Sequence, residues 1–176
     1  MLKLDGLTKT YAGQRGVSSV SFEVAPGEVL GFVGPNGAGK TTTLRMIVGT
    51  LEPDQGAVQV LGQDVWSNRQ AAQSLMGYLP EHAPLYDDMT PRTYLDFLLS
   101  ARGLARKQRP ELVSQAAIRT HIEDVLDRRI EGLSKGYRRR VALAGALSHD
   151  PPVLILDEPS DGLDPNQKRV TRALIR

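Results

Sequence analysis

The sequence of 176 residues contains no cysteine, which excludes disulfides, thiolate zinc sites and cysteine nucleophiles. No apolar run approaches the roughly 18 residues that a membrane-spanning helix needs, and the first residues lack the long apolar core of a secretory signal. The formal net charge is only +2, too small a bias to indicate nucleic-acid binding. Together with an apolar content of 40% and a charged content of 24%, these absences favour one globular domain in the cytosol.

A glycine-rich segment lies between an expected strand, residues 28–33, and an expected helix that begins near Lys40 and ends at Gly49. Glycines let the backbone turn its N–H groups inward, and the helix then aims its positive end at the same anion. Lys40 can reach the β- and γ-phosphates of a nucleotide, and the Thr41 hydroxyl can ligate Mg²⁺. The pattern predicts a nucleoside triphosphate site formed by Gly34, Pro35, Asn36, Gly37, Ala38, Gly39, Lys40, Thr41 and Thr42.

The chain alternates expected strands with expected helices, which favours an α/β fold. Strands are expected at residues 20–24, 57–61, 76–79 and 153–156, and the last is a continuous apolar run typical of a strand buried on both faces. From about residue 81 helical patterns dominate. Thr90 and Pro91 are expected to cap and begin a helix that Gly103 ends, and a second helix is expected at residues 110–120.

Asp157 and Glu158 follow the expected strand 153–156 at its C-terminal end, where open α/β sheets bind their ligands. A carboxylate there can hold Mg²⁺, so Asp157 is a candidate metal ligand. Glu158 can polarise the water that attacks the γ-phosphate, as a catalytic base. Alternatively, the two carboxylates only face water, but the phosphate loop upstream favours the site.

The ordered set of motifs resembles the nucleotide-binding domain of the ATP-binding cassette family. Leu133-Ser134-Lys135-Gly136-Tyr137 matches the family signature, usually Leu-Ser-Gly-Gly-Gln, at three of five positions, and residues 160–164 are similar to the D-loop. Tyr11 matches the aromatic residue on which adenine stacks. The resemblance implies a P-loop NTPase core, a mixed sheet flanked by helices, over residues 1–81 and 140–176. It also implies an inserted helical subdomain over residues 82–139 that ends in the signature.

This resemblance implies an ATPase subunit that uses ATP and Mg²⁺ to drive transport. Two such domains would pair head to tail, most simply as a homodimer, with Ser134 and Gly136 of one facing the ATP of the other. The subunit would act through a transmembrane permease at the cytoplasmic face of the cell membrane, without a nucleic-acid partner. The Leu-Ser-Lys-Gly-Tyr form of the signature is similar to that of exporter subunits, which favours export over import. Two alternatives stay open: a soluble cassette ATPase acting on ribosomes or DNA, and an ATP-binding fragment without hydrolysis.

Several positions depart from the family pattern. Glu81 stands where the family usually has a glutamine, and it is expected to ligate the metal through a charged oxygen instead of a neutral one. Residues 138–140 place three arginines at the start of a helix, where the macrodipole disfavours them. They either pair with acidic groups or phosphate, or form a solvated cationic face.

The sequence also stops at Arg176, before the family's switch histidine. His82, His121 and His149 all precede the strand 153–156, so none of them can take that place. Loss of a buried strand exposes apolar surface at a cost of about 25 cal/mol per Å². We therefore expect an incomplete cassette that is less stable than a complete one.

Overall fold

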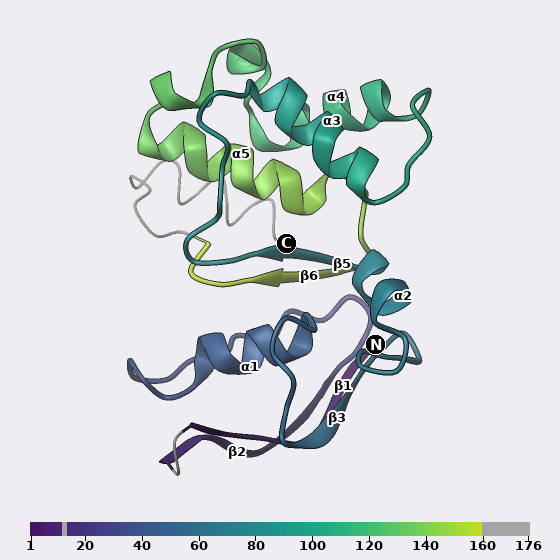
Figure 1. The fold of residues 1–176 in the computed structure, drawn as a ribbon, viewed down its shortest axis with the longest axis vertical. Coiled ribbons are helices and arrows are strands. Elements are labelled where there is room, and N and C mark those ends of the chain that lie inside the picture. The colour runs from purple at the N-terminus through teal and green to yellow at the C-terminus, as the bar shows by residue number, and fades with distance from the viewer. Residues whose placement is uncertain (12–13, 160–176) are drawn as a thin grey trace. The chain divides into compact units, whose positions relative to one another are not determined.

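The computed structural model describes residues 1–11 and 14–159 of the chain (Figure 1). It contains two compact units, Met1–Met76 and Gly77–Arg176. The first is built mainly from strands and the second mainly from helices. The second unit holds both these helices and the strand that precedes Asp157, so the expected boundaries at residues 81 and 139 stay a prediction. The expected D-loop, residues 160–164, lies outside the described residues.

The first unit contains a four-stranded antiparallel sheet. Leu2 and Leu4 are buried while Asp5 is exposed, an alternation that gives the sheet one apolar face. Val58 and Val60 of the third strand are buried in the same way. The strands are β1 (Leu2–Tyr11), β2 (Gln14–Val24), β3 (Gln55–Val60) and β4 (Gln63–Asp64). Across the sheet they lie in the order β2-β1-β3-β4.

Helix α1 (Lys40–Ile47) contacts β1 and β2, and a short helix, α2 (Arg69–Ser74), follows the sheet. The buried residues Thr43, Met46 and Ile47 recur at the spacing of one helix face. The chain leaves α1 through Gly49, whose φ of 72° is the left-handed conformation that ends helices, as the sequence predicts.

Residues 28–33 form no strand, so the prediction of a strand before the phosphate loop is wrong. A strand requires a hydrogen-bonded neighbour, and within the described part of the chain neither sheet includes this segment. Val29 and Val33 are 68% and 94% exposed, and the ring of Phe32 lies 5.9 Å from that of Phe22. An apolar run is therefore insufficient here to form a strand without a partner strand.

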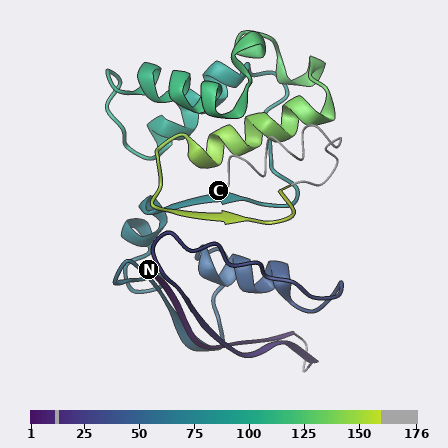
Figure 2. The ribbon, with the colours of Figure 1, turned by 180° about the vertical axis from the view of Figure 1, so that it is seen from behind.

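In the second unit, two strands and three helices form a β-helices-β arrangement. The arrows of β5 and β6 point the same way and lie side by side (Figures 1 and 2), so the pair is parallel and the helices form its crossover connection. The strands are those predicted at residues 76–79 and 153–156, although only Ile155 of the second is fully buried. The elements are β5 (Met76–Leu79), α3 (Pro91–Ala101), α4 (Arg109–Thr120), the 3-10 turns Glu123–Val125 and Ile130–Gly132, α5 (Lys135–Leu147) and β6 (Val153–Leu156).

The helices enclose the apolar core of this unit, whose members include Leu95, Leu99, Val113, Ile122 and Val141. Thr90 caps α3, because its hydroxyl accepts a hydrogen bond from the Thr93 amide, and Pro91 is the first helical residue. Both features are as predicted. The core also buries Tyr94. Desolvation, and to a lesser extent electrostatic repulsion from the nearby Tyr86, raises the pKa of the Tyr94 hydroxyl to about 12.

Candidate functional site

The phosphate loop has the backbone shape that its glycines predict at two positions. Gly37 and Gly39 have φ of 81° and 86°, which side chains disfavour, whereas Gly34 has no positive φ. A Cβ on Gly39 would stand 2.7 Å from the carbonyl oxygen of Gly16 on β2. Glycine is thus required at position 39, both by the backbone conformation there and by the close approach of β2.

Helix α1 begins without a side-chain cap, since its first residue follows Gly39 directly. Among the described residues, the amides of Lys40, Thr41 and Thr42 donate to no backbone oxygen, whereas the Thr43 amide bonds the Gly39 carbonyl at 2.8 Å. Uncapped amides at a helix start, together with the macrodipole, form a site for an anion.

The ammonium of Lys40 lies over the same loop. Its Nζ donates to the carbonyl oxygens of Gly34 at 2.7 Å and Pro35 at 3.0 Å. The structure therefore brings together one cation and a row of amides at the place where the sequence predicts phosphates.

Tyr11 lies at the end of β1 and is 47% exposed. Its ring rests against Gly16, where an added Cβ would come within 2.7 Å of Tyr11 Cδ2. Because Gly16 also contacts Gly39, it links the predicted adenine-stacking ring to the phosphate loop. The sequence reasoning missed Gly16, although a glycine inside a strand is a signal of close backbone approach.

In the second unit, Asp157 and Glu158 form an acidic turn immediately after β6. The Asp157 amide donates to the Leu79 carbonyl at 2.8 Å, which continues the β5–β6 pairing. Asp157 is only 5% exposed, and Glu158 is exposed with a φ of 49°, unusual for a residue with a side chain. The turn thus presents the predicted base outward and keeps the predicted metal ligand inside.

The chemistry of the Asp157 side chain fits a magnesium ion. Asp157 Oδ2 is buried and, within residues 1–11 and 14–159, has no hydrogen-bond partner. A buried carboxylate oxygen without a donor is an oxygen ligand that a hard cation can satisfy. In the same part of the chain no group of three or more His, Cys, Asp or Glu could hold a metal. A metal site there would need further ligands, such as phosphate oxygens.

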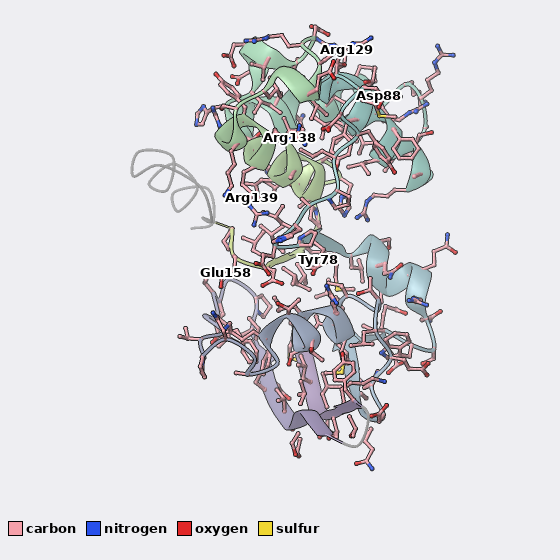
Figure 3. All side chains as sticks on the ribbon, turned by 60° about the vertical axis from the view of Figure 1, so that its left-hand side comes forward. Tyr78, Asp88, Arg129, Arg138, Arg139 and Glu158 are labelled. Atoms are coloured by element: carbon pink, nitrogen blue, oxygen red, sulfur yellow. The ribbon has the colours of Figure 1, made fainter. Side chains whose placement is uncertain are left out.

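The three arginines at the start of α5 are paired and do not form a solvated cationic face. Arg138 bonds the carboxylate of Asp87 at 2.7 Å, and Arg140 lies over the ring of Tyr137, 4.1 Å from its centroid. Arg139 donates to backbone carbonyls at the end of β5 and in the acidic turn (Figure 3). Sequence reasoning left both interpretations open, because the partners of Arg138 and Arg139 are distant in the chain.

Glu81 follows β5, and its side chain is 49% exposed. Its backbone carbonyl is one of those bound by Arg139, so the same guanidinium links the residues around Glu81, Asp157 and Glu158. The structure thus groups these three predicted site residues within one unit. The phosphate loop and Tyr11 belong to the other unit.

The predicted signature begins α5. Ser134 is the N-cap residue, and its hydroxyl accepts from the Tyr137 amide at 3.4 Å, while Gly136 is buried in the first turn. The Tyr137 hydroxyl donates to Asp124 at 2.6 Å. Tyr137, which stands where the family usually has glutamine, therefore bonds within its own unit.

These features define an α/β phosphate-loop protein, and comparison with known proteins identifies its family. A family model described as "ABC transporter" matches residues 17–161. The chain belongs to the ABC transporter family and carries its ATP-binding domain.

Two curated relatives are ATP-binding proteins of this family. The chain is 38% identical to the Nod factor export ATP-binding protein I of Paraburkholderia xenovorans (strain LB400), over 96% of its own length and 56% of the relative's. It is 39% identical to the uncharacterized ABC transporter ATP-binding protein YxlF of Bacillus subtilis (strain 168), over 94% and 54% of the two chains. The chain thus spans about half the length of each of these two relatives.

The fold agrees with that assignment. A solved ATP-binding subunit of an ABC transporter superposes with a TM-score of 0.88 and 29% identity, covering 99% of this chain and 73% of that one. No helix within residues 1–11 and 14–159 has the length and apolar character needed to cross a membrane.

Proposed function

We propose that this chain binds ATP together with Mg²⁺ and hydrolyses it, as the ATPase part of a membrane exporter. The observation that carries the proposal is the start of α1. There, left-handed glycines precede free amides, and the Lys40 ammonium lies over the loop. A polyphosphate is the anion that fits such a row of donors, and the family membership favours ATP.

The predicted residues take separate roles in this proposal. The Tyr11 ring stacks on adenine, and the loop from Gly34 to Thr42 holds the phosphates. Thr41, Glu81 and Asp157 supply oxygen ligands to Mg²⁺, which would neutralise charge on the β- and γ-phosphates. Glu158 accepts a proton from the attacking water as general base, which its exposed position permits.

Hydrolysis is proposed to need a second copy of the domain. Ser134 and Gly136 at the start of α5 would face the γ-phosphate held by the partner copy and add donors where charge develops. A transmembrane permease would couple this pairing to export at the cytoplasmic face of the membrane, and nucleic acid would have no part. The relative that acts in Nod factor export supports the direction of transport, whereas the cargo would be set by the permease.

The test is steady-state Mg-ATP hydrolysis by the purified chain, with Lys40→Ala as the blank. Turnover above the blank that disappears in Glu158→Gln, with ATP binding retained, would support both the activity and the base. ATP binding without turnover would indicate a nucleotide-binding fragment. If neither the wild-type chain nor Glu158→Gln binds ATP, the proposed function is wrong.

A further inference from the structure

Arg139 contacts the ends of both strands in the second unit through one guanidinium. Nη1 donates to the carbonyl oxygens of Pro80 and Glu81, both at 2.9 Å. Nη2 donates to those of Asp157 at 2.8 Å and Glu158 at 2.7 Å. Each terminal nitrogen thus bonds one chain segment, and the planar group joins the two segments.

Within the part of the chain that the structure describes, the carbonyls that Arg139 binds lie beyond the strand pairing. The β5–β6 ladder reaches the bond from the Asp157 amide to the Leu79 carbonyl, and the chain turns away beyond it. Glu158 adopts its positive φ at this point, a conformation that persists only where the surroundings hold it. A cation bound to the carbonyls of Asp157 and Glu158 restrains the backbone on both sides of that turn.

We propose that Arg139 is a positioning residue that holds the Glu81 segment and the Asp157–Glu158 turn in a fixed relation. Its contacts are to backbone oxygens, so it acts on these residues by placing their Cα atoms and leaves the carboxylates free for a ligand. A metal ion bound by the Glu81 and Asp157 carboxylates would then meet ligands that are already aligned. This last step rests on the proposed function, whereas the clamp itself does not.

Arg138 is a matched control, because it precedes Arg139 on α5 and carries the same charge. Its partners, the Asp87 carboxylate and the Ile130 carbonyl, lie on the helical side of the unit and not at the strand ends. Arg138→Gln removes the same charge from the same helical turn but leaves the four carbonyl contacts of Arg139 in place.

The first test is amide hydrogen exchange in the nucleotide-free chain, comparing wild type, Arg139→Gln and Arg138→Gln. We expect the Asp157 amide to exchange about ten-fold faster or more in Arg139→Gln, because local opening at the strand ends becomes easier. Amides of α3 and α4 should keep their wild-type rates in both variants. Unchanged exchange at Asp157, equal acceleration there in Arg138→Gln, or uniform acceleration across the unit would each overturn the clamp.

A second readout separates positioning of metal ligands from general support. ATP affinity is measured with Mg²⁺ and with EDTA. Arg139→Gln should reduce the increase in ATP affinity that Mg²⁺ produces, while the affinity measured in EDTA should stay near that of wild type. Arg139→Lys, which keeps the charge but loses the planar fork, should restore part of that gain. An equal loss with and without Mg²⁺ would overturn the positioning role. If wild type binds no ATP at all, the proposed function fails, and the exchange result alone decides the clamp.

Discussion

The phosphate loop and the acidic turn after β6 obtain their shapes by different means. The loop is shaped mostly by its own residues, two left-handed glycines and a lysine that bonds the loop carbonyls, and it is approached from outside by Gly16 and Val17 of β2. The acidic turn is held by partners distant in the sequence, the Leu79 carbonyl and the Arg139 guanidinium. Local changes should therefore damage the loop, whereas the turn should be sensitive to packing of the whole second unit.

The largest effect on ATP binding is expected in the loop, from Lys40→Ala. Removing the ammonium leaves the phosphates without their nearest cation, and charge-assisted contacts of this kind are worth several kcal/mol. We expect ATP affinity to fall about 100-fold or more, measured by titration calorimetry, with little change in the melting temperature. Lys107→Ala, at an exposed site between α3 and α4, is the control. An affinity loss shared by that control would point to overall charge instead.

The acidic turn should be most sensitive to Gly77→Ala on β5. A Cβ there would collide with the Ala146 carbonyl of α5 and stand 2.8 Å from Pro151 Cγ. Since a backbone carbonyl cannot rotate away, we expect a loss of about 3 kcal/mol in unfolding free energy. Urea unfolding measures it, and Gly132→Ala, where an added Cβ meets nothing within 4 Å, is the control. Equal stability of the two variants would contradict this packing.

Gly39→Ala tests whether the loop depends on one backbone conformation. The positive φ and the approach of Gly16 both oppose a side chain, so we expect a cost of about 2 kcal/mol, shared between ATP affinity and the stability of the first unit. Gly31→Ala, which precedes the loop and meets nothing within 4 Å, should be close to neutral. Wild-type ATP binding and stability in Gly39→Ala would mean that the loop is not held in this conformation.

The smallest effect is a pH dependence of stability, which we expect from Tyr94 in the second unit. Because burial raises the pKa of Tyr94 to about 12, its hydroxyl ionises more easily in the unfolded chain. The neutral form stabilises the fold fully below pH 10, and this contribution is lost as pH rises from about 10 to 12. The expected loss at pH 11 is about 1.4 kcal/mol. Tyr94→Phe should remove this pH-dependent part, and Tyr11→Phe, an exposed ring in the first unit, should not. If the stabilities of Tyr94→Phe and wild type change in parallel above pH 10, the prediction that Tyr94 ionisation destabilises the fold is wrong.

Local patterns predicted many of the elements. Strands at 76–79 and 153–156, the Thr90 cap with Pro91, and the end of α1 at Gly49 all follow from residues within a few positions of each other. Residues 28–33 have an equally apolar pattern and form no strand. Strand formation depends on a neighbour, which a local pattern does not contain.

For the site, the sequence alone supplied the candidate groups and their order: a glycine-rich loop at 34–42, a carboxylate pair at 157–158 and the signature residues Ser134 and Gly136. These are short-range features, set by backbone conformation and residue type within one turn. Only the tertiary structure decided that Gly16 packs against both Tyr11 and Gly39, and that Arg139, among three adjacent arginines, reaches the strand ends. Such contacts join residues far apart in the chain, and their geometry arises only when helices and strands pack.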